Sequence, residues 1–270
     1  MAAHPERRPR KKLHIVQLLP NFMTIAALCS GLTAVRFAIE GRFGFAVALI
    51  ILAAILDGLD GRLARLLKSE SDIGAELDSL CDLVNFGVAP ALIIYLWALQ
   101  GMRSEGWIAC LVYAVACLLR LARFNIGNRL PAKDSSSFQG VPSPAGALLV
   151  MLPIYLSNTL DTGQPYASGA VAVWMAIVGG LMVSRFPTPS FKRVTVYSEN
   201  VSFVLLASVA VVAALVTYPW PTLASASLIY LGILTYSFFR RRPLHKPAEA
   251  KAEAPVEAPI TTPAGDDPSA

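Results

Sequence analysis

Four aspartates interrupt apolar stretches of the chain, at positions 57, 60, 78 and 82. One carboxylate at the centre of a membrane costs about 2.5–3.5 kcal/mol, so four without partners would cost on the order of 10 kcal/mol. Clusters of carboxylate oxygens are the ligands that Mg²⁺, Mn²⁺ and Ca²⁺ prefer. We therefore predict a divalent-metal site formed by Asp57, Asp60, Asp78 and Asp82, whose charge a pair of ions would balance.

Helix geometry brings these carboxylates to similar depth. At about 1.5 Å per residue, Asp57 and Asp60 lie roughly 18 and 14 Å from the polar turn near residue 70, and Asp78 and Asp82 roughly 11 and 17 Å. Spacing by three and four residues places 57, 60, 61, 64 and 65 on one helix face, and 74, 78 and 82 on one face of the next helix. Separately solvated acids at a helix end are common singly, but they do not explain four in matched register.

Membrane-spanning helices must carry these residues. The chain has 270 residues, of which 55% are hydrophobic and 15% charged, and its mean hydropathy is +0.55. A helix needs about 20 apolar residues to cross a bilayer. The sequence predicts an all-α polytopic membrane helix bundle with about eight transmembrane helices, at 22–39, 43–67, 72–99, 106–125, 143–160, 167–184, 201–217 and 222–239.

The distribution of basic residues orients this bundle. Of the 23 Lys and Arg residues, only Arg36, Arg42 and Arg103 fall outside the N-terminal arm, the loops on the same side and the tail. Basic residues near helix ends stay in the cytoplasm, so we expect both termini and the aspartates to face that side. Topology and anionic head groups also explain the net charge of +5, and we expect no nucleic-acid partner.

Composition divides the chain into a basic juxtamembrane arm (1–20), a membrane domain (21–240) and a disordered cytoplasmic tail (241–270) rich in Pro, Ala and Glu. The three histidines lie in the two terminal segments, which argues against histidine catalysis. The cysteines occupy apolar segments without CxxC spacing, and we expect buried free thiols at Cys29, Cys81, Cys110 and Cys117.

The aspartates and the small and basic residues between them form a specific motif. The pattern Asp57-x-x-Asp60-Gly61-x-x-Ala64-Arg65-x8-Gly74-x3-Asp78-x3-Asp82 resembles the CDP-alcohol phosphatidyltransferase signature at every defined position. The stretches PNFMT (20–24), SDIGAELDSLCDLVNFGVAPA (71–91), RLARFN (120–125), FQGVPSPA (138–145) and SRFPTPSFK (184–192) are similar to the serine-using members of that family.

The resemblance implies transfer of the phosphatidyl group of CDP-diacylglycerol to the hydroxyl of L-serine, giving phosphatidylserine and CMP. It implies that two divalent cations, Mg²⁺ or Mn²⁺, on the four aspartates hold the diphosphate, and that Asp82 is also the general base. Direct acidification of the hydroxyl by a metal ion is an open alternative. The family's contacts to CDP-diacylglycerol fall, by position, on Asn21, Thr24, Gly61, Ala64, Arg65 and Ser71.

A serine acceptor needs a cation for its carboxylate. Arg120 and Arg123, three residues apart near a helix end, can face one cavity, and Asn125 follows them. An ordinary basic flank of a membrane helix explains both arginines equally well. Asn85, one turn beyond Asp82, is a further candidate contact, with hydrogen bonding inside the bundle as its alternative.

Other functions remain open at this point. Glycerol 3-phosphate or inositol phosphate could be the acceptor, although a phosphate would favour a denser basic pocket. From another class, a cation transporter would also place acids in a membrane, but no internal repeat of the kind that transporters show is evident. Small residues in the later segments, Gly179 and Gly180 among them, would permit a homodimer.

Overall fold

The computed structural model describes residues 18–67, 69, 71–102, 104–129, 138–161, 165–184, 187–188 and 201–239. Apart from two strands of two residues each, its regular elements are helices. In chain order they are α1 (Leu19–Ile39), α2 (Phe43–Leu66), α3 (Asp72–Asp82), the π-helix η2 (Leu83–Val88), α4 (Ala89–Ile94), the π-helix η3 (Tyr95–Leu99), α5 (Ser104–Arg129), β1 (Phe138–Gln139), α6 (Ser143–Val150), α7 (Leu152–Thr159), α8 (Ser168–Val183), β2 (Pro187–Thr188), α9 (Val201–Thr217) and α10 (Pro219–Phe239).

These elements occupy the eight predicted segments. α3 to η3 run on as one helical stretch, and α6 and α7 together fill the segment from 143 to 160. Within the described residues, four helices are long and apolar enough to cross a membrane, namely 19–39, 43–66, 73–99 and 104–127. The helical membrane bundle is thus confirmed, while the number of spans and the sidedness stay predictions. The arm up to residue 17 and the tail from residue 240 lie outside the described residues.

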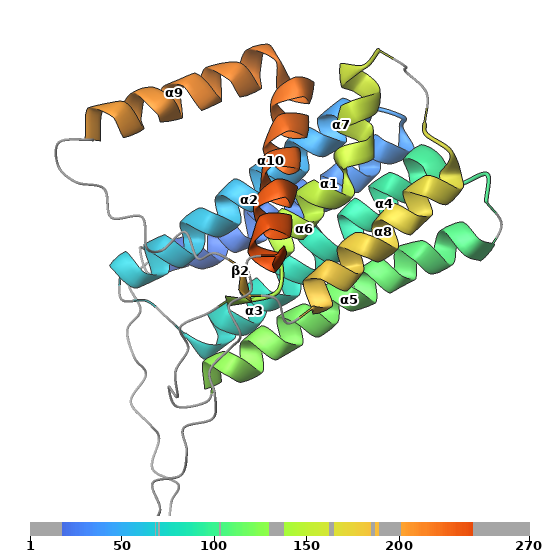
Figure 1. Ribbon diagram of the computed structural model, residues 1–270. Coiled ribbons are helices and arrows are strands. Elements are labelled where there is room, and N and C mark those ends of the chain that lie inside the picture. Colours follow the sequence, from blue (N-terminus) through green and yellow to red (C-terminus); the bar gives the residue numbers. More distant parts are fainter. Residues whose placement is uncertain are drawn as a thin grey trace, which may run out of the picture.

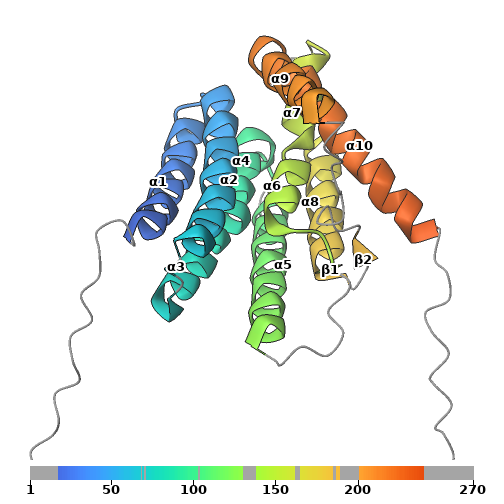
Figure 2. The same cartoon turned by 90° about the vertical axis from the view of Figure 1, so that its left-hand side faces the viewer.

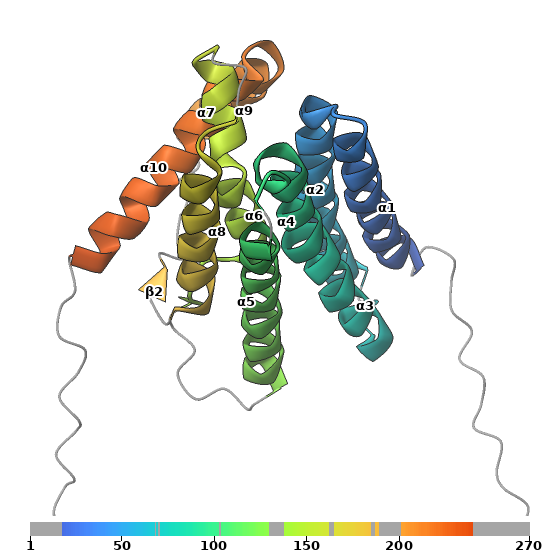
Figure 3. The ribbon, with the colours of Figure 1, turned by 90° about the vertical axis from the view of Figure 1, so that its right-hand side faces the viewer.

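The helices pack in two groups that meet around a common apolar core. α1 and α2 lie side by side, with α3 and α4 against them (Figures 2 and 3). α5 packs along α8, and α10 crosses α7. α9 reaches away from the rest of the bundle and touches it through α10 (Figure 1). The chain therefore places the aspartate-bearing helices, α2 and α3, in one group and α5 in the other.

The third helical stretch changes its winding directly after Asp82. Pro90 has no N–H for the carbonyl of Phe86, four residues earlier, which a regular α-helix would require. The Tyr113 hydroxyl of α5 donates to that carbonyl, at 2.9 Å, so the polar group is satisfied inside the apolar core, as a membrane demands. This bond also ties α5 to the helix that carries Asp82.

A second proline explains the break between α6 and α7 at Met151. Pro153 leaves the carbonyl of Leu149 without its partner in the regular helix. The indole N–H of Trp174, on α8, donates to it at 2.9 Å. Both proline breaks are thus held by an aromatic donor from a neighbouring helix.

Glycines set the closest helix contacts. A Cβ at Gly179 would lie 3.2 Å from the Cβ of Ala116, where α8 packs on α5, whereas one at Gly180 would meet nothing within 4 Å. Gly179 therefore serves packing within the chain and is not free for the dimer contact suggested by its sequence. Gly180 is exposed.

All four cysteines are free, as predicted, and three of them are buried. The expectation of burial is wrong for Cys29, which is exposed. It shares an outward face of α1 with Phe22, Ile25 and Leu32. In a membrane protein such a face lies against lipid, so an apolar thiol has no need of the core.

At the two adjacent glycines of α8, the same substitution should change the stability of the protein by different amounts. Gly179→Leu should lower the melting temperature of the detergent-purified protein, because overpacking of a tight contact costs about 1–3 kcal/mol. Gly180→Leu, the matched control, should melt close to the wild type. Equal melting of the two variants would contradict the packing described for α5 and α8.

Candidate active site

Three of the four aspartates converge between α2 and α3. One carboxylate oxygen from each of Asp57, Asp60 and Asp78 lies within 4.8 Å of the other two. Asp60 is buried and the other two are half-buried. The oxygens are close enough to share one cation, because Mg²⁺ and Ca²⁺ bind oxygen at about 2.0–2.6 Å.

Asp82 lies beside this group, at the end of α3. Its carboxyl group contacts that of Asp57, and its Oδ1 is buried without a hydrogen-bond partner among the described residues. A buried, unpartnered carboxylate oxygen is costly unless something positive binds there. Together with the converging oxygens of the other three, it gives a donor set that fits divalent cations.

Among the described residues, the cations near the cluster are too few to balance it. Arg120 of α5 lies close enough to Asp57 and Asp82 to interact with both. The Nε of Arg65 donates instead to the carbonyl of Gly61, at 3.0 Å. One arginine beside four carboxylates leaves most of the negative charge for a bound ion, and the residues present therefore suit a metal.

A cavity of about 590 Å³ opens on the Asp60 and Asp78 side of the cluster. This volume falls in the range of small-molecule sites. Every residue that the sequence assigned to CDP-diacylglycerol lines it. The full lining is Pro20, Asn21, Thr24, Asp60, Gly61, Ala64, Arg65, Ser69, Ser71, Gly74, Ala75 and Asp78.

Local structure explains how α1 and α3 meet at this cavity. Ser71 caps α3, its Oγ accepting the N–H of Gly74 at 3.1 Å. A Cβ at Gly74 would lie 3.1 Å from the Oδ1 of Asn21, so a larger residue there would push against the side chain of Asn21 on α1. Ser71 thus has a structural role in addition to any contact with a ligand.

Thr24 connects α1 to the aspartates. Its hydroxyl lies 2.5 Å from Asp60 Oδ2 and 3.1 Å from the carbonyl of Pro20, and its one hydrogen can serve either. Gly61 follows on α2, where a Cβ would meet nothing within 4 Å. The absent side chain therefore enlarges the cavity and does not serve helix packing.

On the other side of the cluster, Arg120 is held by Ser143. The guanidinium Nη1 donates to Ser143 Oγ at 2.6 Å, and Ser143 is fully buried at the start of α6. Arg120 also lies over the ring of Phe124, 5.6 Å from its centroid. Tyr230 of α10 is a further neighbour of its charge. Side chains of α5, α6 and α10 thus surround the guanidinium group on the side away from the aspartates.

The loop before Ser143 is anchored to the end of α8. β1 pairs antiparallel with β2, with Phe138 opposite Thr188. Gly140 has φ of 82°, and a Cβ there would lie 2.7 Å from the carbonyl oxygen of Met182. Glycine is therefore required for the chain to turn against α8 and enter α6 with Ser143 at its first position.

The other acceptor candidates lie elsewhere. Arg120 bonds to Ser143, whereas Arg123 donates to the carbonyl of Val183, at the end of α8; that both arginines face one cavity stays a prediction. Asn125 donates to Ser79 Oγ at 2.9 Å. Asn85 is buried where a Cβ on Gly31 would lie against its Oδ1. The winding change after Asp82 turns Asn85 towards α1.

Three residues of the site were missed by sequence reasoning. Ser69 lines the cavity, and its Oγ is buried without a partner among the described residues. Ser143 bonds to Arg120 and Tyr230 lies near its charge. In the sequence, Ser143 stands between two prolines at the start of an apolar segment. This position indicates the start of a helix but does not show that Ser143 bonds to Arg120.

Comparisons with known proteins agree with this geometry. The family model described as CDP-alcohol phosphatidyltransferase matches residues 17–183, and the one described as CDP-alcohol phosphatidyltransferase 2 matches residues 199–234. A Mycobacterium leprae protein named CDP-diacylglycerol–serine O-phosphatidyltransferase is 42% identical over 233 residues, which cover 85% of this chain and 75% of that protein.

Proteins with the same name in more distant organisms are also similar. The Helicobacter pylori protein is 37% identical over 177 residues, covering 66% of this chain and 74% of its own length. The Bacillus subtilis protein is 36% identical over 177 residues, which cover 65% of this chain and 92% of that protein. Since the first family model spans more than half of the sequence, including all four aspartates, the chain belongs to the CDP-alcohol phosphatidyltransferase family.

Proposed function

We propose that this membrane enzyme transfers the phosphatidyl group of CDP-diacylglycerol to the hydroxyl of L-serine, forming phosphatidylserine and releasing CMP. The observation that carries the proposal is the cavity lined by Asn21, Thr24, Gly61, Ala64, Arg65 and Ser71, which borders the aspartates. Relatives at 36–42% identity bear the name of this activity. That family membership also favours an enzyme over the cation transporter that the acids alone allowed.

The cavity side of the cluster would hold the donor. The space at Gly61 and Ala64 suits the flat cytidine ring, and Arg65, exposed at the cavity wall, can reach a diphosphate with the N–H groups that Gly61 leaves free. The acyl chains can remain in the bilayer while the head group enters, since α1 and α2 border both lipid and cavity.

We infer that two divalent ions, Mg²⁺ or Mn²⁺, occupy the site formed by Asp57, Asp60, Asp78 and Asp82. Bound there, they would neutralise the diphosphate and favour departure of CMP. The carboxylates contribute by presenting oxygens of both α2 and α3 at one point, so that the donor phosphates are held against helices that also contact the cytidine.

The opposite side would hold serine. Arg120 offers one positive charge, which matches one carboxylate, and it lies beside Asp82. In the step we propose, Asp82 takes the proton of the serine hydroxyl. The hydroxyl oxygen at the same time bonds to the phosphorus that carries diacylglycerol. The bond from this phosphorus to the bridging oxygen breaks, and that oxygen leaves on CMP. Asp82 is thus assigned the general base.

The sidedness of the enzyme is part of the same proposal. We propose that the aspartates face the cytoplasm, and the excess of Lys and Arg in the loops on their side supports this orientation. A homodimer would have to use outward faces such as that of Gly180, since Gly179 packs inside the chain.

The metal site can be tested on a single carboxylate. Asp60→Asn should weaken Mn²⁺ binding roughly tenfold or more, because carboxylate charge sets the affinity of such sites; titration followed by electron paramagnetic resonance measures it. Asp161→Asn is a matched control, since Asp161 lies after α7 at the other end of the bundle and its φ of 50° suits asparagine. Equal Mn²⁺ affinity in both variants would refute the assignment.

The reaction predicts one product pair. Purified protein with Mn²⁺ or Mg²⁺, CDP-diacylglycerol and labelled serine should yield labelled phosphatidylserine and an equal amount of CMP. At Mn²⁺ concentrations that saturate the variant, because Asp82 is also assigned as a metal ligand, Asp82→Asn should lower kcat by about 10²-fold or more, as expected for loss of a general base. Product from glycerol 3-phosphate or inositol phosphate, and none from serine, would change the acceptor but leave the family chemistry intact.

Ser143 provides a separate test of the acceptor side. Ser143→Ala removes the hydrogen bond that holds Arg120, so the KM for serine should rise roughly tenfold, the usual cost of a lost hydrogen bond to a charged group. The KM for CDP-diacylglycerol should not change. Ser168→Ala, which loses a bond to the carbonyl of Ala98 at the far end, is the control. A parallel rise in both KM values would show a structural role only.

A further inference from the structure

A second cavity lies at the opposite end of the bundle from the aspartates. It measures about 390 Å³, and Arg42 and Trp97 line it with Ser157, Asn158 and the residues that flank Arg42. Thr24, at the active site, and Gly41, at this cavity, are 17 residues apart on α1 and its end, which corresponds to about 25 Å. The second cavity therefore cannot be part of the active site.

Backbone geometry fixes Arg42 at this cavity. Gly41, with φ of 73°, ends α1 in a left-handed turn. Its N–H bonds to the carbonyl of Ala38 at 3.0 Å, and the N–H of Arg42 bonds to that of Phe37 at 2.8 Å. These two hydrogen bonds together form the Schellman motif, which fixes the backbone position of Arg42. Arg42 therefore starts from a rigid backbone position.

Two aromatic rings fix its side chain as well. The rings of Phe37 and Phe45 are stacked, with centroids 5.5 Å apart. The Arg42 guanidinium carbon lies 4.8 Å from the first centroid and 4.3 Å from the second. Contact with aromatic faces holds the planar guanidinium in one orientation while leaving its N–H groups available. A ligand at this arginine would thus meet a preorganised donor.

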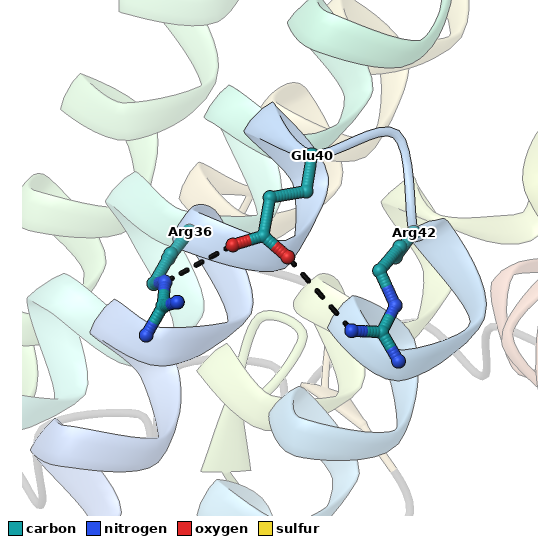
Figure 4. Close-up of polar contacts among 3 residues, drawn as sticks. All are labelled: Arg36, Glu40 and Arg42. Carbon is teal, nitrogen blue, oxygen red and sulfur yellow. Dashed lines mark hydrogen bonds and ion pairs between the residues drawn. The ribbon is translucent and has the colours of Figure 1, made fainter.

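The charge of Arg42 is only partly compensated. Glu40 lies between two arginines, with 3.1 Å from its Oε1 to Arg36 Nε and 3.9 Å from its Oε2 to Arg42 Nη1 (Figure 4). One carboxylate for two guanidinium groups leaves a net charge of +1 in this cluster. The longer of the two ion pairs belongs to Arg42, the residue that lines the cavity.

The rest of the lining suits a phosphate attached to a lipid. Phe43 and Gly44, the first two residues of α2, line the cavity. The N–H groups in the first turn of a helix favour anions. Asn158 uses one amide N–H on the carbonyl of Ile154 and carries a second. Trp97 is of the type enriched at membrane boundaries.

The apolar surroundings favour a lipid over a free anion. Ile39 and Phe45, on either side of Arg42, are exposed by 70% and 55%. On a membrane protein such surfaces contact acyl chains. We propose that this cavity binds the head group of an anionic phospholipid in the leaflet opposite the active site, with its phosphate on Arg42.

The test is binding of dioctanoyl phosphatidylglycerol to the full-length protein in detergent, measured by native mass spectrometry and as a ligand-dependent rise in melting temperature. The wild type should bind it more tightly than dioctanoyl phosphatidylcholine. Arg42→Gln should weaken this binding about tenfold, as expected for one charge-assisted hydrogen bond. Glu40→Gln, which removes the competing carboxylate, should tighten it.

A control variant and control ligands separate a lipid site from a general effect of charge or stability. Arg62→Gln removes an exposed arginine of α2 at the active-site end and should bind like the wild type. Because each variant is compared with and without lipid, any loss of intrinsic stability from Arg42→Gln cancels. Equal binding by wild type and Arg42→Gln, equal affinity for the two lipids, or equally tight binding of inorganic phosphate would each overturn the proposal.

Discussion

The arrangement of this molecule depends on the repulsion among four carboxylates enclosed between α2 and α3. No pair of helices in an apolar bundle would bring Asp57, Asp60 and Asp78 within a few ångströms of one another unless a positive partner repaid the cost. Arg120 is one such partner, but a single charge is not enough. The donor set therefore suits divalent cations, and the packing around it leaves a cavity of about 590 Å³ beside the carboxylates.

The surrounding helices meet this demand by satisfying their own polar groups locally. Pro90 and Pro153 break the third and fifth helical stretches, and in each case the carbonyl four residues earlier receives a donor from another helix, Tyr113 or Trp174. A membrane offers no water for this purpose. The Tyr113 bond joins α5 to the third stretch and so connects the two groups of helices, and the Trp174 bond joins α8 to α6 within the second group.

Much of this was predictable from the sequence, for identifiable reasons. The apolar segments and the depth of the aspartates follow from helix rise and period alone, and the small residues at Gly61 and Gly74 follow from their place on the same faces. The roles of Arg123 and Asn85 did not follow. Arg123 bonds to a carbonyl 60 residues away, and Asn85 is redirected by a π-helix that the hydrophobic pattern does not show. Hydrogen bonds between residues far apart in the chain, and a local change from α- to π-helix, cannot be predicted from the spacing of apolar residues.

The aspartates also divide the site into halves of different origin. The cavity side is built from α1, α2 and the start of α3, so its residues all lie between 20 and 78. The Arg120 side is built from α5, α6 and α10, which reach it from the rest of the chain. Only the carboxylates, with Asp57 in contact with Asp82, belong to both. Because the helices that would select the acceptor differ from those that would hold the nucleotide, this architecture allows the acceptor to change while the donor site and its metal ligands remain as they are.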